Sequence, residues 1–343
     1  MFFVISGYCI AATADAQRLK NRTLWDYFRR RFRRIYPPYW IWLVLSIVGM
    51  LAVESYWQQG ILTDDNHAVA QPAEFTLSQW VGNLSLTEVF RYQFLGSPSK
   101  FLLDHAWTLC YEEQFYLVVG LCLWLSPRRF FPAMALVTLL VYANSMMNFN
   151  IRLVRERGWD LNAWQLHYDG LFFNGRWLEF AAGVGVYYCV NYAKRRGTLV
   201  LSTVLLAALT QSCWRFANLG EFYANGEQFR SSAFLFSGLL LLLHRWDQPL
   251  ASSWLVRSFG WLGQRSYSLY LVHWPLVKVI SHQFDLWGLR SPRFTVGVII
   301  PLGVLASVAT AFVFHRLVER RFLNVSATPD VRKGESSAVE LLK

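Results

Sequence analysis

The sequence predicts an all-α protein, a polytopic bundle of transmembrane helices. Of its 343 residues, 54% are hydrophobic and 16% are charged, whereas soluble domains carry roughly a quarter of charged residues. Apolar segments that can cross a bilayer recur along the chain. Lysine and arginine alternate in density between successive loops, as they do in membrane proteins of fixed orientation.

About nine apolar segments can cross a bilayer, wholly or with tilt. They lie at residues 2–14, 38–53, 108–126, 130–147, 171–191, 197–212, 231–243, 266–281 and 295–315. No internal repeat divides them, so a single membrane domain is predicted over residues 1–323. The polar, small-residue-rich tail 324–343 is predicted to be mobile and cytoplasmic.

Five arginines precede the second of these segments, in FRRRFRRIYPPYW at residues 28–40. Alternate loops hold 22 lysines and arginines against 9 in the opposite set, which places this block and the C-terminus on the cytoplasmic side. This asymmetry accounts for most of the net charge of +11, so no nucleic-acid partner is needed. Arginines at a membrane mouth also suit a phosphate-rich ligand, because guanidinium forms forked hydrogen bonds.

The longest loop, residues 54–107, is predicted to lie outside the membrane. It is either a lid over an outward-facing site or, for most of its length, a plain connector. The five cysteines show no CxxC motif and no metal-ligand spacing. We therefore predict packing roles for them and no metal site.

The segment DHAWTLCYEEQFYL, residues 104–117, carries the candidate catalytic residues Glu112 and His105. On a helix, Glu112 shares a face with Tyr116 and Glu113 points elsewhere. A carboxylate near the start of a span persists when it is paired, protonated or faces a water-filled cavity. Histidine and carboxylate at one membrane mouth can perform acid–base chemistry on a hydroxyl.

An equally weighted alternative is helix capping, by Asp104 or Thr108, together with anchoring of this segment at the membrane interface. Further along the chain, Arg176 and Glu179 are three residues apart and can form an ion pair. His273 lies on an aromatic helix face, for which packing is favoured over catalysis. His315 and Glu319, at the inner end of the last segment, are predicted to pair.

Four motifs in order resemble the integral membrane acyltransferase 3 family, over nearly the whole chain. They are FFVISGYCI, RRRFRRIYPPYW, HAWTLCYEEQFYL and SYSLYLVHWPL; the family forms are FFVLSGF, RRxxRIxPxY, WSLxxExxFY and SYSLYLxHxP. The resemblance implies acyl transfer, commonly of acetyl, to hydroxyls of sugars. It implies that Arg31 and Arg34, with Arg30 beside them, bind the donor, and that Glu112 is the family's acidic residue.

The resemblance also implies ten spans, the first carrying an Arg or Lys and, ten residues later, an essential histidine. Nine spans with a cytoplasmic C-terminus place Met1 outside, which is an awkward start for membrane insertion. We therefore expect the domain to be N-terminally incomplete here, with the reading frame continuing upstream into that helix.

Together these features predict a membrane O-acyltransferase that uses cytoplasmic acyl-CoA, commonly acetyl-CoA, as donor substrate, with no permanently bound cofactor. Its acceptor would be a hydroxyl of a cell-surface or secreted glycan or a lipid-linked sugar, and its location the bacterial inner membrane. Two alternatives remain at this point: a transporter or flippase of a lipid-linked sugar, and an inactive truncated homologue.

Overall fold

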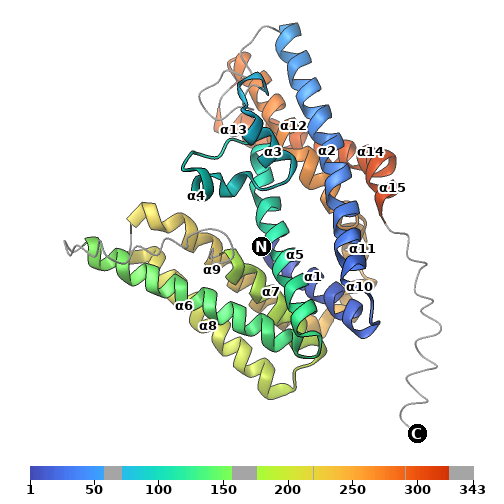
Figure 1. Cartoon of the computed structure of the whole chain (residues 1–343). Coiled ribbons are helices and arrows are strands. Elements are labelled where there is room, and N and C mark those ends of the chain that lie inside the picture. Colours follow the sequence, from blue (N-terminus) through green and yellow to red (C-terminus); the bar gives the residue numbers. More distant parts are fainter. Residues whose placement is uncertain (58–71, 157–175, 219, 290, 324–343) are drawn as a thin grey trace. The chain divides into compact units, whose positions relative to one another are not determined.

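In a computed structural model, the described residues are 1–57, 72–156, 176–218, 220–289 and 291–323. They form helices, and no strand occurs among them (Figure 1). The main helices are α1 (Phe2–Leu19), α2 (Leu24–Trp57), α3 (Leu77–Leu84), α4 (Arg91–Leu95), α5 (Trp107–Leu125), α6 (Phe130–Glu156), α7 (Arg176–Asn191), α8 (Arg195–Asn218), α9 (Gly220–Leu243), α10 (Asp247–Ser252), α11 (Trp254–Gly263), α12 (Ser266–Leu286) and α14 (Ile300–Phe314). Short α13 (Pro292–Phe294) and α15 (Arg320–Phe322) flank α14 through two π-helical turns.

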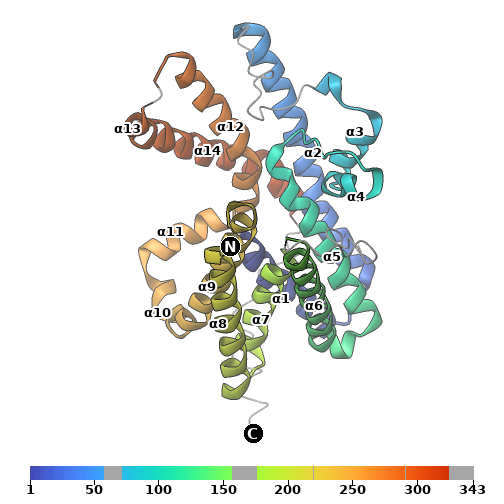
Figure 2. The same ribbon diagram turned by 90° about the vertical axis from the view of Figure 1, so that its left-hand side faces the viewer.

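The chain divides into two compact units, and each is described by itself. The first comprises Met1–Phe28 and Ser46–Gln264, and the second comprises Arg29–Leu45 and Arg265–Lys343. The first unit contains α1, α3 to α11 and the two end portions of α2, helices that can be followed in Figures 1 and 2. The all-α class predicted from the sequence is confirmed for the described residues.

The first unit is organised around a very close crossing of α1 and α7. A β-carbon placed on Gly7 would lie 2.0 Å from the carbonyl oxygen of Phe180, and one on Gly183 would lie 2.0 Å from that of Val4. Only glycine fits at both positions. Small residues that let two backbones approach are typical of helix packing in membranes.

The second unit joins part of α2 to α12 and α14. The Tyr267 hydroxyl donates to the carbonyl of Ile35 at 2.8 Å, and the rings of Trp42 and Phe314 meet edge-to-face at 5.3 Å. The arginine block, predicted to be a loop, is helical. Arginine is a good helix former, and α2 continues through Pro37 and Pro38 into the apolar segment.

Three helices are long and apolar enough to cross a membrane among the described residues: Leu24–Ala52, Arg195–Trp214 and Pro292–Phe322. They contain the predicted spans 197–212 and 295–315, and all of the predicted span 38–53 except its last residue. Most of the other predicted segments are helical too, but crossing by those helices stays a prediction, and part of 171–191 lies outside the described residues. The predicted tail 324–343 also lies outside them.

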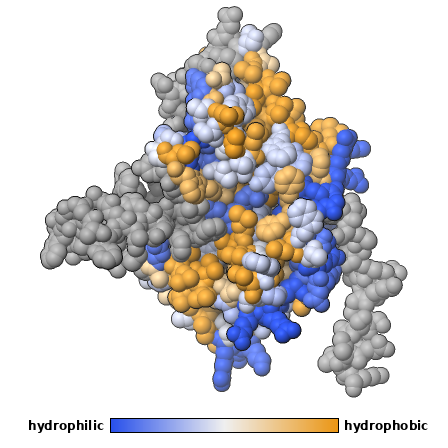
Figure 3. All heavy atoms as spheres, viewed as in Figure 1, coloured by the Kyte–Doolittle hydropathy of each residue, from blue (hydrophilic) through white to orange (hydrophobic). Residues whose placement is uncertain are grey.

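Many large apolar side chains point outward from these helices. On α8, for example, Leu199 is 59% exposed and Leu206 is 63% exposed. Figure 3 shows apolar residues spread over much of the visible face. Extended apolar surface is rare on soluble monomers, and it suits contact with lipid.

Candidate functional site

Glu112 stands where α5 meets α1. Its Oε1 accepts hydrogen bonds from the Ser6 hydroxyl at 2.7 Å and from the Tyr116 hydroxyl at 2.8 Å. Tyr116 lies one helical turn further along α5, as the predicted face requires. Oε2 has no hydrogen-bond partner among the described residues. One carboxylate oxygen is therefore anchored, and the other is available to a ligand.

Ser6 was not singled out in the sequence analysis. It lies in the first motif, FFVISGYC, in which it is a small polar residue within an apolar run. That context is a usable signal, because a hydroxyl buried in an apolar helix normally needs a partner. The partner itself, 106 residues away, follows only from the packing of α1 against α5.

An aromatic cluster surrounds the same end of these helices. The ring of Phe3 lies 6.3 Å from that of Trp107 and 5.4 Å from that of Phe115. The Arg176 guanidinium lies over Trp107 at 5.4 Å and donates to Glu179 at 2.9 Å. The predicted ion pair is confirmed, and Glu179 is 3% exposed.

His105 lies in the 3-10 turn Asp104–Ala106, directly before α5. It is 9% exposed. At 1.5 Å of rise per residue, its backbone is about 10 Å along the helix axis from that of Glu112. The two residues thus occupy one end of α5 at different depths. A catalytic role for His105 stays a prediction.

The capping interpretation of this segment is wrong. The N-cap position of α5 is Ala106, and no side chain makes a capping hydrogen bond there. Asp104 belongs to the preceding 3-10 turn. The Thr108 hydroxyl donates to the carbonyl of His105 at 3.3 Å, whereas a capping side chain accepts from a backbone N–H.

The arginines of the predicted donor site lie on α2, in the second unit. Arg31 is 8% exposed and lies on the same buried face of α2 as Ile35 and Tyr39. Arg34 is exposed and Arg30 is partly exposed. The structure therefore gives the members of the RxxR pair different surroundings. Their binding of a donor stays a prediction.

A second polar cluster lies in the second unit. Nδ1 of His315 lies 2.9 Å from Glu319 Oε2, which confirms their predicted pairing. The hydroxyl of Ser268, from α12, donates to the same carboxylate. Ser268 and Glu319 are 0% and 2% exposed, so this group links α12 to the end of the last helix. Nδ1 of His273 lies 2.7 Å from the carbonyl of Tyr270 in its own helix.

Comparison with known proteins identifies the family. The sequence matches the family described as "Acyltransferase domain" over residues 1–316. The chain belongs to this family. The resemblance inferred from the four motifs is thereby confirmed, and Glu112 lies in one of those motifs.

Curated relatives of this acyltransferase-family chain are named for acetyl transfer. It is 26% identical over 297 residues to the O-acetyltransferase OatA of Staphylococcus aureus, covering 82% of this chain and 46% of that protein. It is 25% identical over 308 residues to the peptidoglycan O-acetyltransferase OatA of Listeria monocytogenes, covering 83% and 45%. The chain spans about half the length of these relatives. No solved structure matches it.

Proposed function

We propose that this chain is the membrane domain of an O-acetyltransferase that moves an acetyl group from acyl-CoA to a hydroxyl of a cell-surface glycan. Membership of the acyltransferase family and the names of the relatives support acetyl transfer. The observation that carries the proposal is Glu112, whose Oε1 is anchored by two hydroxyls while Oε2 has no partner among the described residues.

In this mechanism the acceptor hydroxyl donates a hydrogen bond to Oε2 of Glu112. Its oxygen attacks the thioester carbonyl, the carbon–sulfur bond breaks, and CoA leaves as the thiol after taking up the proton. Ser6 and Tyr116 keep the carboxylate in one orientation, so little reorganisation is needed as charge develops. His105, at the same end of α5, is the second candidate for carrying the proton.

The donor is assigned to the arginine block. Guanidinium groups bind phosphate oxygens with two parallel hydrogen bonds, and Arg34 and Arg30 are accessible on α2. Arg31 would contribute from the buried face. The predicted topology puts this block inside and the start of α5 outside, so the thioester end of the donor would have to reach the outer side for this attack.

The transporter alternative requires charges that line a path through the bundle. The two candidates, Arg176 and Glu179, instead bind each other at 2.9 Å. This arrangement favours a structural ion pair over a substrate path.

The test is acetyl transfer by the purified chain in proteoliposomes that contain radiolabelled acetyl-CoA, with peptidoglycan fragments outside. We expect base-labile label on the glycan and equimolar release of CoA. Transport of a lipid-linked sugar without either product would contradict the proposal. The absence of every activity would favour the inactive homologue.

A further inference from the structure

A cavity of about 650 Å³ lies on the side of α5 away from α1. It is lined by α5 and by the segment that holds α3, the 3-10 turn Glu88–Phe90 and α4. Its walls are predominantly apolar. The apolar lining includes Leu77, Val81, Leu86, Phe90, Phe94 and Leu117. Its volume is within the usual range for ligand pockets, roughly 300–1,000 Å³.

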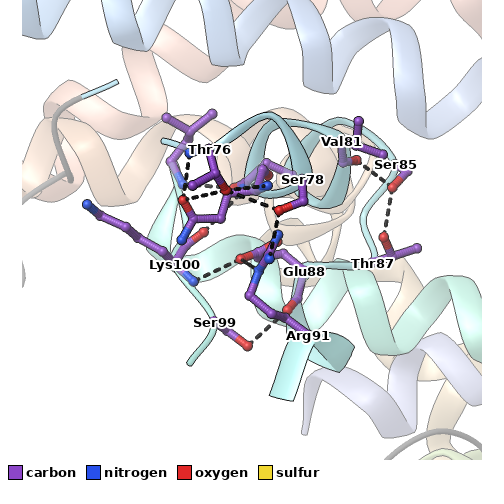
Figure 4. Close-up of polar contacts among 12 residues, drawn as sticks. Thr76, Ser78, Val81, Ser85, Thr87, Glu88, Arg91, Ser99 and Lys100 are labelled. Carbon is purple, nitrogen blue, oxygen red and sulfur yellow. Dashed lines mark hydrogen bonds and ion pairs between the residues drawn. The ribbon is translucent and has the colours of Figure 1, made fainter. Parts of the chain in front are cut away.

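A buried ion pair between Glu88 and Arg91 holds together the segment that lines this cavity opposite α5. Arg91 donates to both carboxylate oxygens of Glu88, at 2.6 and 2.9 Å, and to the Ser78 hydroxyl at 3.1 Å. The backbone N–H of Lys100 also donates to Glu88, and Glu88 is 1% exposed. Figure 4 shows these contacts converging from α3, α4 and the chain that follows. The described part of the long loop, residues 72–106, is therefore folded and held together by this ion pair, and we call it the cap.

A buried amide N–H of the cavity wall has no hydrogen-bond acceptor among the described residues. Gln114 lines the cavity and is 5% exposed. Its Nε2 amide makes no hydrogen bond within the described part of the chain. A buried N–H without an acceptor is unfavourable, so the position calls for an oxygen atom supplied by a ligand.

The apolar wall continues onto the outward face of α5. Leu117 lines the cavity and is 52% exposed, and it is followed at helical spacing by Leu121, Trp124 and Leu125, which are 49%, 67% and 66% exposed. α5 contains one of the predicted spans, and such an exposed apolar stripe suits contact with lipid. A hydrocarbon chain can therefore pass from the bilayer into the cavity without crossing water.

We propose that this cavity binds the hydrocarbon chain of a membrane lipid, whose first carbonyl or hydroxyl oxygen accepts a hydrogen bond from Gln114 Nε2. The apolar walls suit a chain better than a sugar, which needs many polar partners. The site is separate from Glu112, which faces α1 on the other side of α5. The proposal does not depend on acetyl transfer.

The test uses the full chain in lipid nanodiscs that contain a fatty acid with a diazirine in its chain. After irradiation, mass spectrometry locates the adducts, and adducts on the exposed face of α8 serve as an internal reference for lipid contact. We expect adducts on α3, α4 and the start of α5. Val81→Trp fills the cavity and should lower them at least fivefold relative to the α8 adducts. Leu84→Trp is the matched control, because Leu84 is exposed on the same helix but is not part of the lining.

Gln114→Leu supplies a second, independent arm. It keeps the size of the side chain and removes the amide N–H, so labelling by the fatty acid should fall at least threefold. Labelling by a diazirine alkane, which has no oxygen, should not fall. The proposal would be overturned if the ratio of cavity adducts to α8 adducts were close to one in the wild type and in both the Val81→Trp and the Leu84→Trp variants. Displacement of the probe by glycan fragments, but not by unlabelled fatty acid, would also overturn it in favour of a sugar site.

Discussion

Replacing Gly183 with alanine should separate α1 from α7. The added β-carbon would lie 2.0 Å from the carbonyl oxygen of Val4 and 2.8 Å from its carbonyl carbon. Ordinary contacts begin at 3.4 Å, so the backbones must move apart by about 1.4 Å. Both obstructing atoms are backbone, which no rotamer change can move. Overpacking costs typically about 1–3 kcal/mol, and we expect Gly183→Ala to reach the upper end of this range.

The same displacement should weaken the candidate site. Ser6 lies one residue before Gly7 on α1, so a shift of this helix should disturb its 2.7 Å hydrogen bond to Glu112. Acetyl transfer should therefore fall together with stability. The assays are thermal unfolding in detergent and transfer of labelled acetyl in proteoliposomes.

Gly238→Ala is the matched control. Gly238 lies within α9, where an added β-carbon would meet nothing within 4 Å. Alanine is the better helix former by about 0.8–1.0 kcal/mol, so this variant should be as stable as wild type or more stable. If Gly183→Ala unfolded at the same temperature as Gly238→Ala, the close crossing of α1 and α7 would be refuted.

Two further predictions concern charged residues. Arg34→Ala should raise the KM for acyl-CoA by about 10-fold or more, because a hydrogen bond to a charged group contributes about 1.5–3 kcal/mol; Arg29→Ala, which removes an exposed arginine of the same block outside the RxxR pair, should have a smaller effect. Equal KM values for the two variants would remove Arg34 from the donor site. Glu88→Gln should leave Arg91 buried without its counter-charge and cost about 3–5 kcal/mol, measured as faster hydrogen exchange in α3 and α4. Unchanged exchange there would show that the ion pair does not brace the cap.

The helices were largely predictable because apolar periodicity and composition decide them locally. The helix boundaries were harder to predict. The arginine block reads as a loop when only its charge is considered, yet α2 runs through it and past Pro37 and Pro38. Charge density reports which side of a membrane a segment occupies, and it does not report whether that segment is helical.

The sequence was enough to select Glu112 as a candidate residue, but it did not reveal the contacts of Glu112. Glu112 and its shared face with Tyr116 follow from helical spacing on one element. Ser6 as its partner depends on how α1 packs against α5, and that packing depends on glycines whose importance appears only in three dimensions. A lid was one of two interpretations of the long loop, but the sequence could not decide between them, because the bidentate Glu88–Arg91 pair and the cavity beneath it arise from tertiary structure.

The central claim is that the Glu112 carboxylate serves acetyl transfer, and the most direct measurement is the transfer rate of Glu112→Gln beside Glu113→Gln. Both changes keep the size of the side chain and remove one charge. Glu113 faces the cavity on the other side of α5, away from Ser6. General acid–base groups contribute roughly 10²–10⁴-fold, so Glu112→Gln should lower the rate by at least about 100-fold and Glu113→Gln by much less. Equal losses in the two folded proteins would contradict the account.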